Sequence, residues 1–184
     1  MTETSATSLN DVSISDELKQ HIRDIVDFPI EGIVFRDITT LLSNPIMFRK
    51  TVDAMAAPFR EIDKVVIIES RGFILGTPIA YAIGAGIVPV RKVGRLPFDT
   101  FAEEYALEYG TATLEVHRDA INPGERVLIV DDLLATGGTV AATIKLVNRL
   151  QGEIVGVSVL AELTALNGRA RTGDIDVRSL VTYG

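Results

Sequence analysis

Two adjacent carboxylates, Asp131 and Asp132, come two residues before a short loop that combines two glycines with two small hydroxyl side chains. The glycines allow consecutive backbone amides to converge on one anion, and a helix that starts at the loop would add its positive N-terminal end. A Walker A loop would carry lysine at position 138, where this chain has glycine, so ATP-driven chemistry is disfavoured. The pattern predicts a site for a phosphate monoester, and we call these residues the phosphate loop: Ala135, Thr136, Gly137, Gly138 and Thr139.

The acidic pair adds a second function to this stretch. Carboxylates placed just before a phosphate-binding loop can accept hydrogen bonds from the vicinal hydroxyls of a sugar phosphate. Either feature alone would be ordinary, because Asp-Asp can simply end a strand and Gly-Gly can simply make a turn. Joined in one stretch, they predict a ribose 5-phosphate site.

The elements that must position this stretch are visible as short apolar runs. Val127–Val130 follows the turn signal Asn122-Pro123-Gly124 and predicts a central parallel strand, with a helix over 140–150 after the loop. Similar runs predict buried strands at 65–68 and 154–160, a short strand at 87–90, a hairpin strand at 111–116 and an edge strand at 177–182. Helices are predicted over 14–25, from Asn44-Pro45 onward, and over 73–83. The fold class is therefore α/β, with a doubly wound and mainly parallel sheet.

Two further polar groups follow predicted strands, at the carboxyl ends where ligands gather in open α/β sheets. Ser70 and Arg71 come after the strand at 65–68, and a basic cluster of Arg91, Lys92 and Arg95 comes after the strand at 87–90. Such residues are often only surface arginines or a solvated turn. On the same edge as the acidic pair, they predict positive charge and hydrogen-bond donors presented to a small polyanion.

Residues 130–139 resemble the phosphoribosyl pyrophosphate signature of type I phosphoribosyltransferases. Their sequence is similar to the version of this signature found in adenine phosphoribosyltransferases. Three other segments agree with that family: 32–38 with its base-binding hood, 69–73 with its pyrophosphate loop and 106–110 with its lid. The resemblance implies one domain over 1–184, with 1–40 contributing the N-terminal hood, and a flexible lid hairpin. It also implies a cis peptide near Glu69 and Ser70.

The resemblance assigns roles residue by residue. The backbone around Val34 and Arg36 would read the edge of adenine, and Phe35 would stack on its ring. Glu108 is the candidate catalytic acid/base facing the purine, and Tyr109 belongs to the lid. The phosphate loop and the acidic pair would hold ribose 5-phosphate, while pyrophosphate would contact Ser70, Arg71, Arg91, Lys92 and Arg95, the last standing where lysine is common.

The implied reaction converts adenine and phosphoribosyl pyrophosphate to AMP and pyrophosphate, with Mg²⁺ held through substrate oxygens and not directly by the protein. The resemblance also implies a homodimer. Two alternatives stay open: a noncatalytic, purine-sensing regulator of the same fold, and the same reaction on another purine base. The regulator would bind nucleic acid, and the chain lacks a helix-turn-helix extension or a basic face for that purpose.

Composition and charge indicate which partners and which cellular compartment to expect. The chain has 184 residues, 25 acidic against 18 basic, for a net charge of −7, so we expect no nucleic-acid partner. No apolar run approaches the ~20 residues of a membrane span, so we expect no membrane partner. The absence of cysteine and the polar start of the chain, without a signal-like segment, predict a cytoplasmic protein. Residues 98–107 show no periodicity and predict a loop, while His117 and Arg118 are expected to face solvent.

Overall fold

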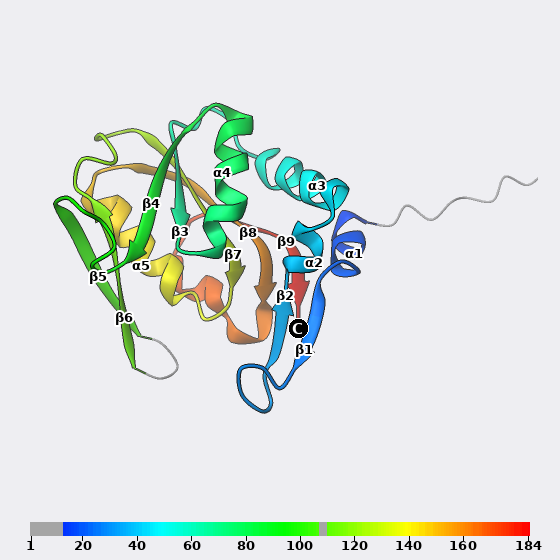
Figure 1. The fold of residues 1–184 in the computed structure, drawn as a ribbon. Coiled ribbons are helices and arrows are strands. Elements are labelled where there is room, and N and C mark those ends of the chain that lie inside the picture. Colours follow the sequence, from blue (N-terminus) through cyan, green and yellow to red (C-terminus); the bar gives the residue numbers. More distant parts are fainter. Residues whose placement is uncertain (1–12, 107–109) are drawn as a thin grey trace, which may run out of the picture.

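The computed structural model describes residues 13–106 and 110–184, and within them a seven-stranded sheet forms the centre of the molecule (Figure 1). The strand order is β5-β6-β4-β3-β7-β8-β9. Strands β4, β3, β7, β8 and β9 run parallel, and β6 and β5 extend the sheet antiparallel. The bounds are β3 (Lys64–Ile68), β4 (Gly86–Lys92), β5 (Thr100–Ala106), β6 (Thr111–His117), β7 (Arg126–Leu134), β8 (Glu153–Leu163) and β9 (Val177–Tyr183).

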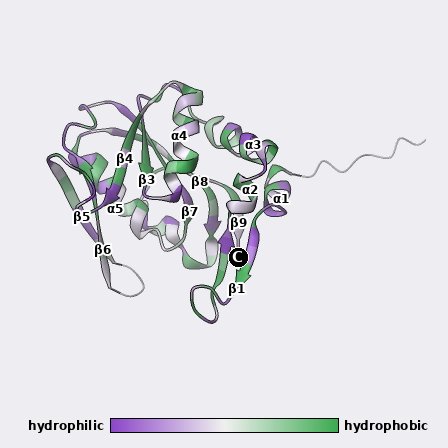
Figure 2. Cartoon of the chain, viewed as in Figure 1, coloured by the Kyte–Doolittle hydropathy of each residue, from purple (hydrophilic) through white to green (hydrophobic). Residues whose placement is uncertain are grey.

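Helices cover both faces of this sheet, as the doubly wound prediction requires. Alternate residues of β3 divide between two core clusters: Val65 and Ile67 pack with residues of α3 (Pro45–Ala56) and α4 (Arg71–Ile83), whereas Val66 and Ile68 pack with residues of α5 (Gly138–Arg149). Hydrophobic colour accordingly runs along the central strands β3 and β4 in Figure 2. The predicted buried strands are confirmed, and β9 lies at the edge of the sheet as expected.

The N-terminal region differs from the predicted single helix over 14–25. Helix α1 (Ile14–Lys19) ends after six residues, and the chain continues as β1 (Arg23–Val26), which pairs antiparallel with β2 (Val34–Asp37). Helical spacing of the apolar residues was misleading here, because pairing with β2 places Ile25 opposite Phe35. A side-chain cap starts α1, since the Ser13 side chain accepts a hydrogen bond from the backbone N–H of Asp16. Helix α2 (Thr39–Leu42) then leads into α3.

The prediction of a loop over 98–107 is also wrong, because β5 occupies most of it. Phe101 and Tyr105 pack against the α5 side of the core, while Ala102 and Glu104 are exposed. This alternation is a strand signal that the aromatic and acidic composition concealed. Helix α5 holds the strand through Lys145, whose ammonium lies 2.7 Å from Glu103, and through Arg149, which donates to the Ala102 carbonyl at 2.9 Å.

The predicted hairpin strand at 111–116 is confirmed as β6, which pairs with β5 along its full length. His117, expected to face solvent, is instead half-buried against Phe98, with ring centroids 6.4 Å apart. Arg118 is exposed as predicted.

Helix α4 begins at Arg71, two residues before the predicted start, and continues through Pro78. It packs very closely on the sheet at Gly76, where a Cβ atom would lie 2.2 Å from Cγ2 of Ile67. Only glycine permits that approach. Among the helices of the described residues, none is long and apolar enough to cross a membrane.

Candidate active site

The carboxyl ends of β3 and β7 meet around a cavity of about 230 Å³. Its lining contains residues from both predicted groups, the acidic pair and the Ser70-Arg71 segment, and it extends to the phosphate loop. Segments that are about sixty residues apart in the chain are neighbours because the two strands pair in parallel. The lining residues are Glu69, Ser70, Arg71, Tyr105, Asp131, Asp132, Leu133, Ala135 and Thr139.

The phosphate loop connects the end of β7 to the start of α5. Gly137 adopts a left-handed conformation with φ of 79°, which is unstrained only for glycine, and α5 begins at the next residue. In the described part of the chain no side chain caps the first amides of α5. Residues 133–140 enclose a small cavity of about 60 Å³ there. Free amides, a helix N-terminus and two threonine hydroxyls thus surround a space suited to a phosphate group.

The acidic pair is buried, with Asp131 8% and Asp132 5% exposed. Burial raises the pKa of Asp131 well above its usual value, and the neighbouring Asp132 charge raises it further. Burial also raises the pKa of Asp132, although Arg71, whose Nε lies 2.9 Å from Oδ2, opposes that effect. Two carboxylates held in this way have unused acceptor capacity that sugar hydroxyls can satisfy.

Glu69 organises the cationic side of the cavity. The peptide between Glu69 and Ser70 is cis, as the family resemblance implied. The Glu69 carboxylate accepts hydrogen bonds from Arg91, at 3.0 Å from Nη2, and from the backbone N–H of Lys92 at 3.0 Å. The Arg91 guanidinium holds the pKa of Glu69 below its usual value. Arg91 is therefore fixed beside the Ser70-Arg71 segment, as expected of residues that act on one ligand.

Arg95 lies in the turn after β4, and a residue that the sequence did not single out shapes this turn. The buried Glu115 accepts hydrogen bonds from the backbone N–H groups of Arg95 and Leu96, both at 2.9 Å. Burial alone would raise the pKa of Glu115, but these amides and that of Gly94 outweigh burial and keep the pKa below its usual value. The side chains of Lys92 and Arg95 are exposed.

The two-stranded sheet of β1 and β2 places Phe35 near the acidic pair. The Phe35 ring stands edge-on to Phe28, with centroids 5.3 Å apart, and lies 5.4 Å from the guanidinium carbon of Arg71. Beside it is an apolar cavity of about 370 Å³ lined by Ile25, Phe28, Phe35 and Asp37. This cavity has the character expected for a flat, apolar ring.

The other two hood residues lie on either side of Phe35. Val34 is exposed. The side chain of Arg36 packs over the ring of Tyr183 at 4.0 Å, so it turns toward β9, and its buried Nε has no hydrogen-bond partner among the described residues. This orientation leaves the backbone of Arg36, and not its side chain, on the side of Phe35.

Two predicted site residues, Glu108 and Tyr109, lie outside the described residues. Tyr105, which was not predicted, lines the main cavity from β5. The two-residue alternation of β5 was the signal that would have placed it there.

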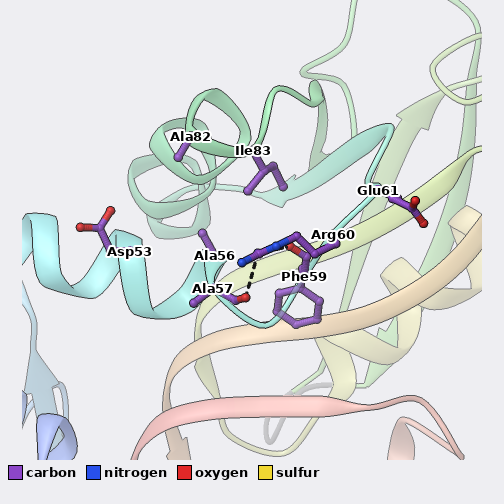
Figure 3. Close-up of a pocket in the computed structure, with 8 residues that line it drawn as sticks. All are labelled: Asp53, Ala56, Ala57, Phe59, Arg60, Glu61, Ala82 and Ile83. Carbon is purple, nitrogen blue, oxygen red and sulfur yellow. Dashed lines mark hydrogen bonds between the residues drawn. The ribbon is translucent and has the colours of Figure 1, made fainter.

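A separate groove of about 430 Å³ lies between the C-terminal ends of α3 and α4 (Figure 3). It contains none of the predicted site residues and opens at the amino ends of β3 and β4. Arg60 reaches across it to donate to the Ala57 carbonyl at 2.8 Å. Its lining combines apolar side chains with the charged Asp53, Arg60 and Glu61, and it lies away from the carboxyl ends of the strands, where the predicted site residues gather.

Comparison with known proteins identifies the family of this chain. The phosphoribosyl transferase domain family matches residues 37–182. An adenine phosphoribosyltransferase of Geobacter metallireducens is 56% identical over 170 residues, covering 91% of this chain and 99% of its own.

Solved structures of such enzymes share the fold. The Rhodothermus marinus enzyme is 53% identical, with a TM-score of 0.88 and coverage of 92% of this chain and 98% of that one. The Saccharomyces cerevisiae enzyme, solved with an imino-altritol bisphosphate and adenine, is 40% identical with a TM-score of 0.86, covering 91% and 98%. The chain belongs to the adenine phosphoribosyltransferases, within the phosphoribosyl transferase domain family.

Proposed function

We propose that this enzyme transfers the 5-phosphoribosyl group of phosphoribosyl pyrophosphate to adenine, giving AMP and pyrophosphate in purine salvage. The observation that carries the proposal is the position of Arg71. Its guanidinium contacts Asp132 of the acidic pair and approaches Phe35 of the hood, so the sugar, leaving-group and base sites adjoin one another.

The ribose 5-phosphate end of the substrate binds at the phosphate loop. Amides of Ala135 to Thr139 and the N-terminus of α5 take the 5-phosphate, and Asp131 and Asp132 accept hydrogen bonds from the ribose hydroxyls. This orientation points the anomeric carbon toward the cavity that Ser70 and Arg71 line.

The pyrophosphate group faces the cationic side of that cavity. Arg71, Arg91, Lys92 and Arg95 supply positive charge, and Ser70 supplies a hydroxyl and an amide. These charges stabilise the leaving group while the anomeric C–O bond breaks and the sugar gains oxocarbenium character.

Mg²⁺ is the cofactor that this chemistry calls for. The diphosphate that the neighbouring arginines bind and the ribose that the acidic pair binds would supply the oxygen ligands of the ion, and no described group of three His, Cys, Asp or Glu side chains would hold it directly. The ion, when bound, neutralises charge on the leaving pyrophosphate. The protein orients the diphosphate that carries it.

Adenine binds against Phe35, with its edge read by the backbone around Val34 and Arg36. Its N9 attacks the anomeric carbon and the base loses a proton overall, so Glu108 contacts N7 and manages that proton. Closure of the lid, to which Tyr109 belongs, excludes water that would otherwise hydrolyse the activated sugar.

The role of Glu108 is open to a direct test. In a single-turnover assay limited by chemistry, we expect Glu108→Gln to slow AMP formation about 10²-fold or more. Full single-turnover rate in this variant would remove Glu108 from the mechanism.

We also infer the context of the enzyme. It acts as one domain over 1–184 with a hood from 1–40, as a homodimer, and in the cytoplasm, for which the cysteine-free composition is the support.

The deciding experiment is a pyrophosphate-coupled turnover assay with phosphoribosyl pyrophosphate and Mg²⁺, run in parallel on adenine, hypoxanthine, guanine and xanthine. We expect product with adenine only. Product with another base would keep the reaction and overturn the assignment of the hood. No product from folded protein with any base would favour the noncatalytic regulator, and a salt-dependent gel shift would then test nucleic-acid binding.

A further inference from the structure

The phosphate loop is backed by a second segment of chain, residues 167–171, which we call the C-terminal turn. It contains the short 3₁₀ helix η2 (Gly168–Arg171) between β8 and β9. A Cβ atom on Gly168 would lie 2.3 Å from the carbonyl oxygen of Ala135, and one on Gly137 would lie 2.3 Å from the carbonyl oxygen of Gly168. The two backbones are thus in direct contact with no side chain between them, and any displacement of the turn is transmitted to the loop.

Arg169 fixes the position of the C-terminal turn. Its Nε and Nη2 atoms donate to the two carboxylate oxygens of Glu162, both at 2.7 Å, and Nη1 donates to the carbonyl of Val177 at 2.7 Å. Ser179 donates to Glu162 from the neighbouring strand at 2.7 Å. Planar, two-pronged pairs of this kind fix geometry as well as charge.

Glu162 connects this arrangement to the strand that carries the loop. It is 4% exposed on β8, where it pairs in register with Leu134, the residue immediately before the phosphate loop. The Arg169 guanidinium holds the pKa of Glu162 below its usual value, so the pair is ionised at neutral pH. One side of the loop is therefore anchored by strand pairing and the other by the clamped turn.

We propose that Arg169 is a positioning residue for the 5-phosphate, acting through Glu162, Ser179 and the backbone of Gly168. The inference rests on the proposed function, because it names what holds the loop that binds the substrate phosphate. A loop with two adjacent glycines has many accessible conformations, and the clamp restricts it to the one in which its amides converge. Arg169 does not line the cavity and contacts no reacting atom.

The test compares Arg169→Ala with Arg171→Ala. Arg171 is exposed in the same short helix and makes no hydrogen bond or ion pair within the described residues, so it is a matched control. Ribose 5-phosphate binding is measured by titration calorimetry, and KM and kcat are measured for phosphoribosyl pyrophosphate and, with that substrate saturating, for adenine. Thermal unfolding of each variant is recorded alongside.

For Arg169→Ala we expect ribose 5-phosphate binding to weaken about tenfold and KM for phosphoribosyl pyrophosphate to rise similarly, because the loop loses its preset geometry. KM for adenine and all constants of Arg171→Ala should remain at wild-type values. Arg169→Lys should fall between, since an ammonium reproduces the charge but not the two-pronged pair.

Unchanged ribose 5-phosphate binding in folded Arg169→Ala would overturn the inference, as would an equal rise in both KM values. Should Arg169→Ala fail to fold, Ser179→Ala, which removes one hydrogen bond from Glu162, takes its place. Weaker ribose 5-phosphate binding with an unchanged KM for adenine would support the inference, and unchanged ribose 5-phosphate binding would overturn it. If the wild-type protein binds ribose 5-phosphate but shows no turnover, the proposed function is refuted. The calorimetric comparison of the variants then still decides the role of Arg169.

Discussion

Arg71 lies between the two chemically different halves of the site: its Nε is 2.9 Å from Asp132, and its guanidinium carbon is 5.4 Å from the ring centre of Phe35. The residue starts α4, so a short, rigid connection from the end of β3 fixes its position. A single cation thereby adjoins both the acidic pair, for which we propose sugar binding, and the hood residue Phe35, for which we propose base binding.

Replacing Arg71 should therefore affect catalysis more than folding. We expect Arg71→Ala to lower kcat/KM for phosphoribosyl pyrophosphate about 10- to 100-fold, the usual effect of removing a charged hydrogen-bond partner. Steady-state kinetics measure the effect, with Arg60→Ala in the remote groove as the control that should retain wild-type constants. Equal losses in the two variants would contradict the assignment.

The acidic pair should make the protein less stable as pH rises. An acid whose pKa is raised in the folded state binds more protons there than in the unfolded chain, so the free energy of unfolding falls between the ordinary and the raised pKa. Asp131→Asn removes that effect and should raise the free energy of unfolding on the order of 1 kcal/mol at about pH 8, while abolishing most turnover. Urea unfolding measures this, and the advantage should disappear toward about pH 4.

Glu115 should show the opposite sign. Its pKa is lowered in the folded state, so it contributes stability above its ordinary pKa and loses that contribution as pH falls through the lowered value. The neutral side chain of Glu115→Gln loses the charge that strengthens the hydrogen bonds from the Arg95 and Leu96 amides, and we expect the free energy of unfolding to fall by about 1–2 kcal/mol at neutral pH. The same variant should raise KM for phosphoribosyl pyrophosphate, because Arg95 lies in the turn that Glu115 holds. Unchanged stability at neutral pH would refute this account.

Tyr183 should matter for the base and not for the sugar phosphate. Its ring lies 4.0 Å from the Arg36 guanidinium and 5.6 Å from the Lys19 ammonium, and so attaches the hood to β9. Cation–ring contacts contribute about 0.5–1 kcal/mol each, and we expect Tyr183→Ala to raise KM for adenine about fivefold. Tyr183→Phe keeps the ring and should behave as wild type. If Tyr183→Ala raised KM for phosphoribosyl pyrophosphate and not for adenine, Tyr183 would not act through the hood.

Sequence patterns predicted best where local chemistry decides the structure. The apolar run before Asp131 specified β7, the glycines specified the turn into α5, and parallel pairing of β3 with β7 then required Arg71 to lie beside the acidic pair. Each of these inferences used only neighbours in the chain and one general property of α/β sheets.

Features that depend on pairing between separate segments were missed. Residues 23–26 have helical spacing, yet form β1 because β2 is available to pair with them. The roles of Glu115 and Gly168 arise from contacts with segments 15 or more residues away, and an isolated glutamate or glycine carries no local sign of such contacts.

Helix α5 meets the phosphate loop with its first residue and holds β5 through Lys145 and Arg149 in its last two turns. Each residue turns a helix by about 100°, so inserting or deleting one residue between these points would point both side chains away from β5. A change of one residue in the length of α5 would therefore detach β5 from the helix, while the same change in a surface connection would leave both contacts in place.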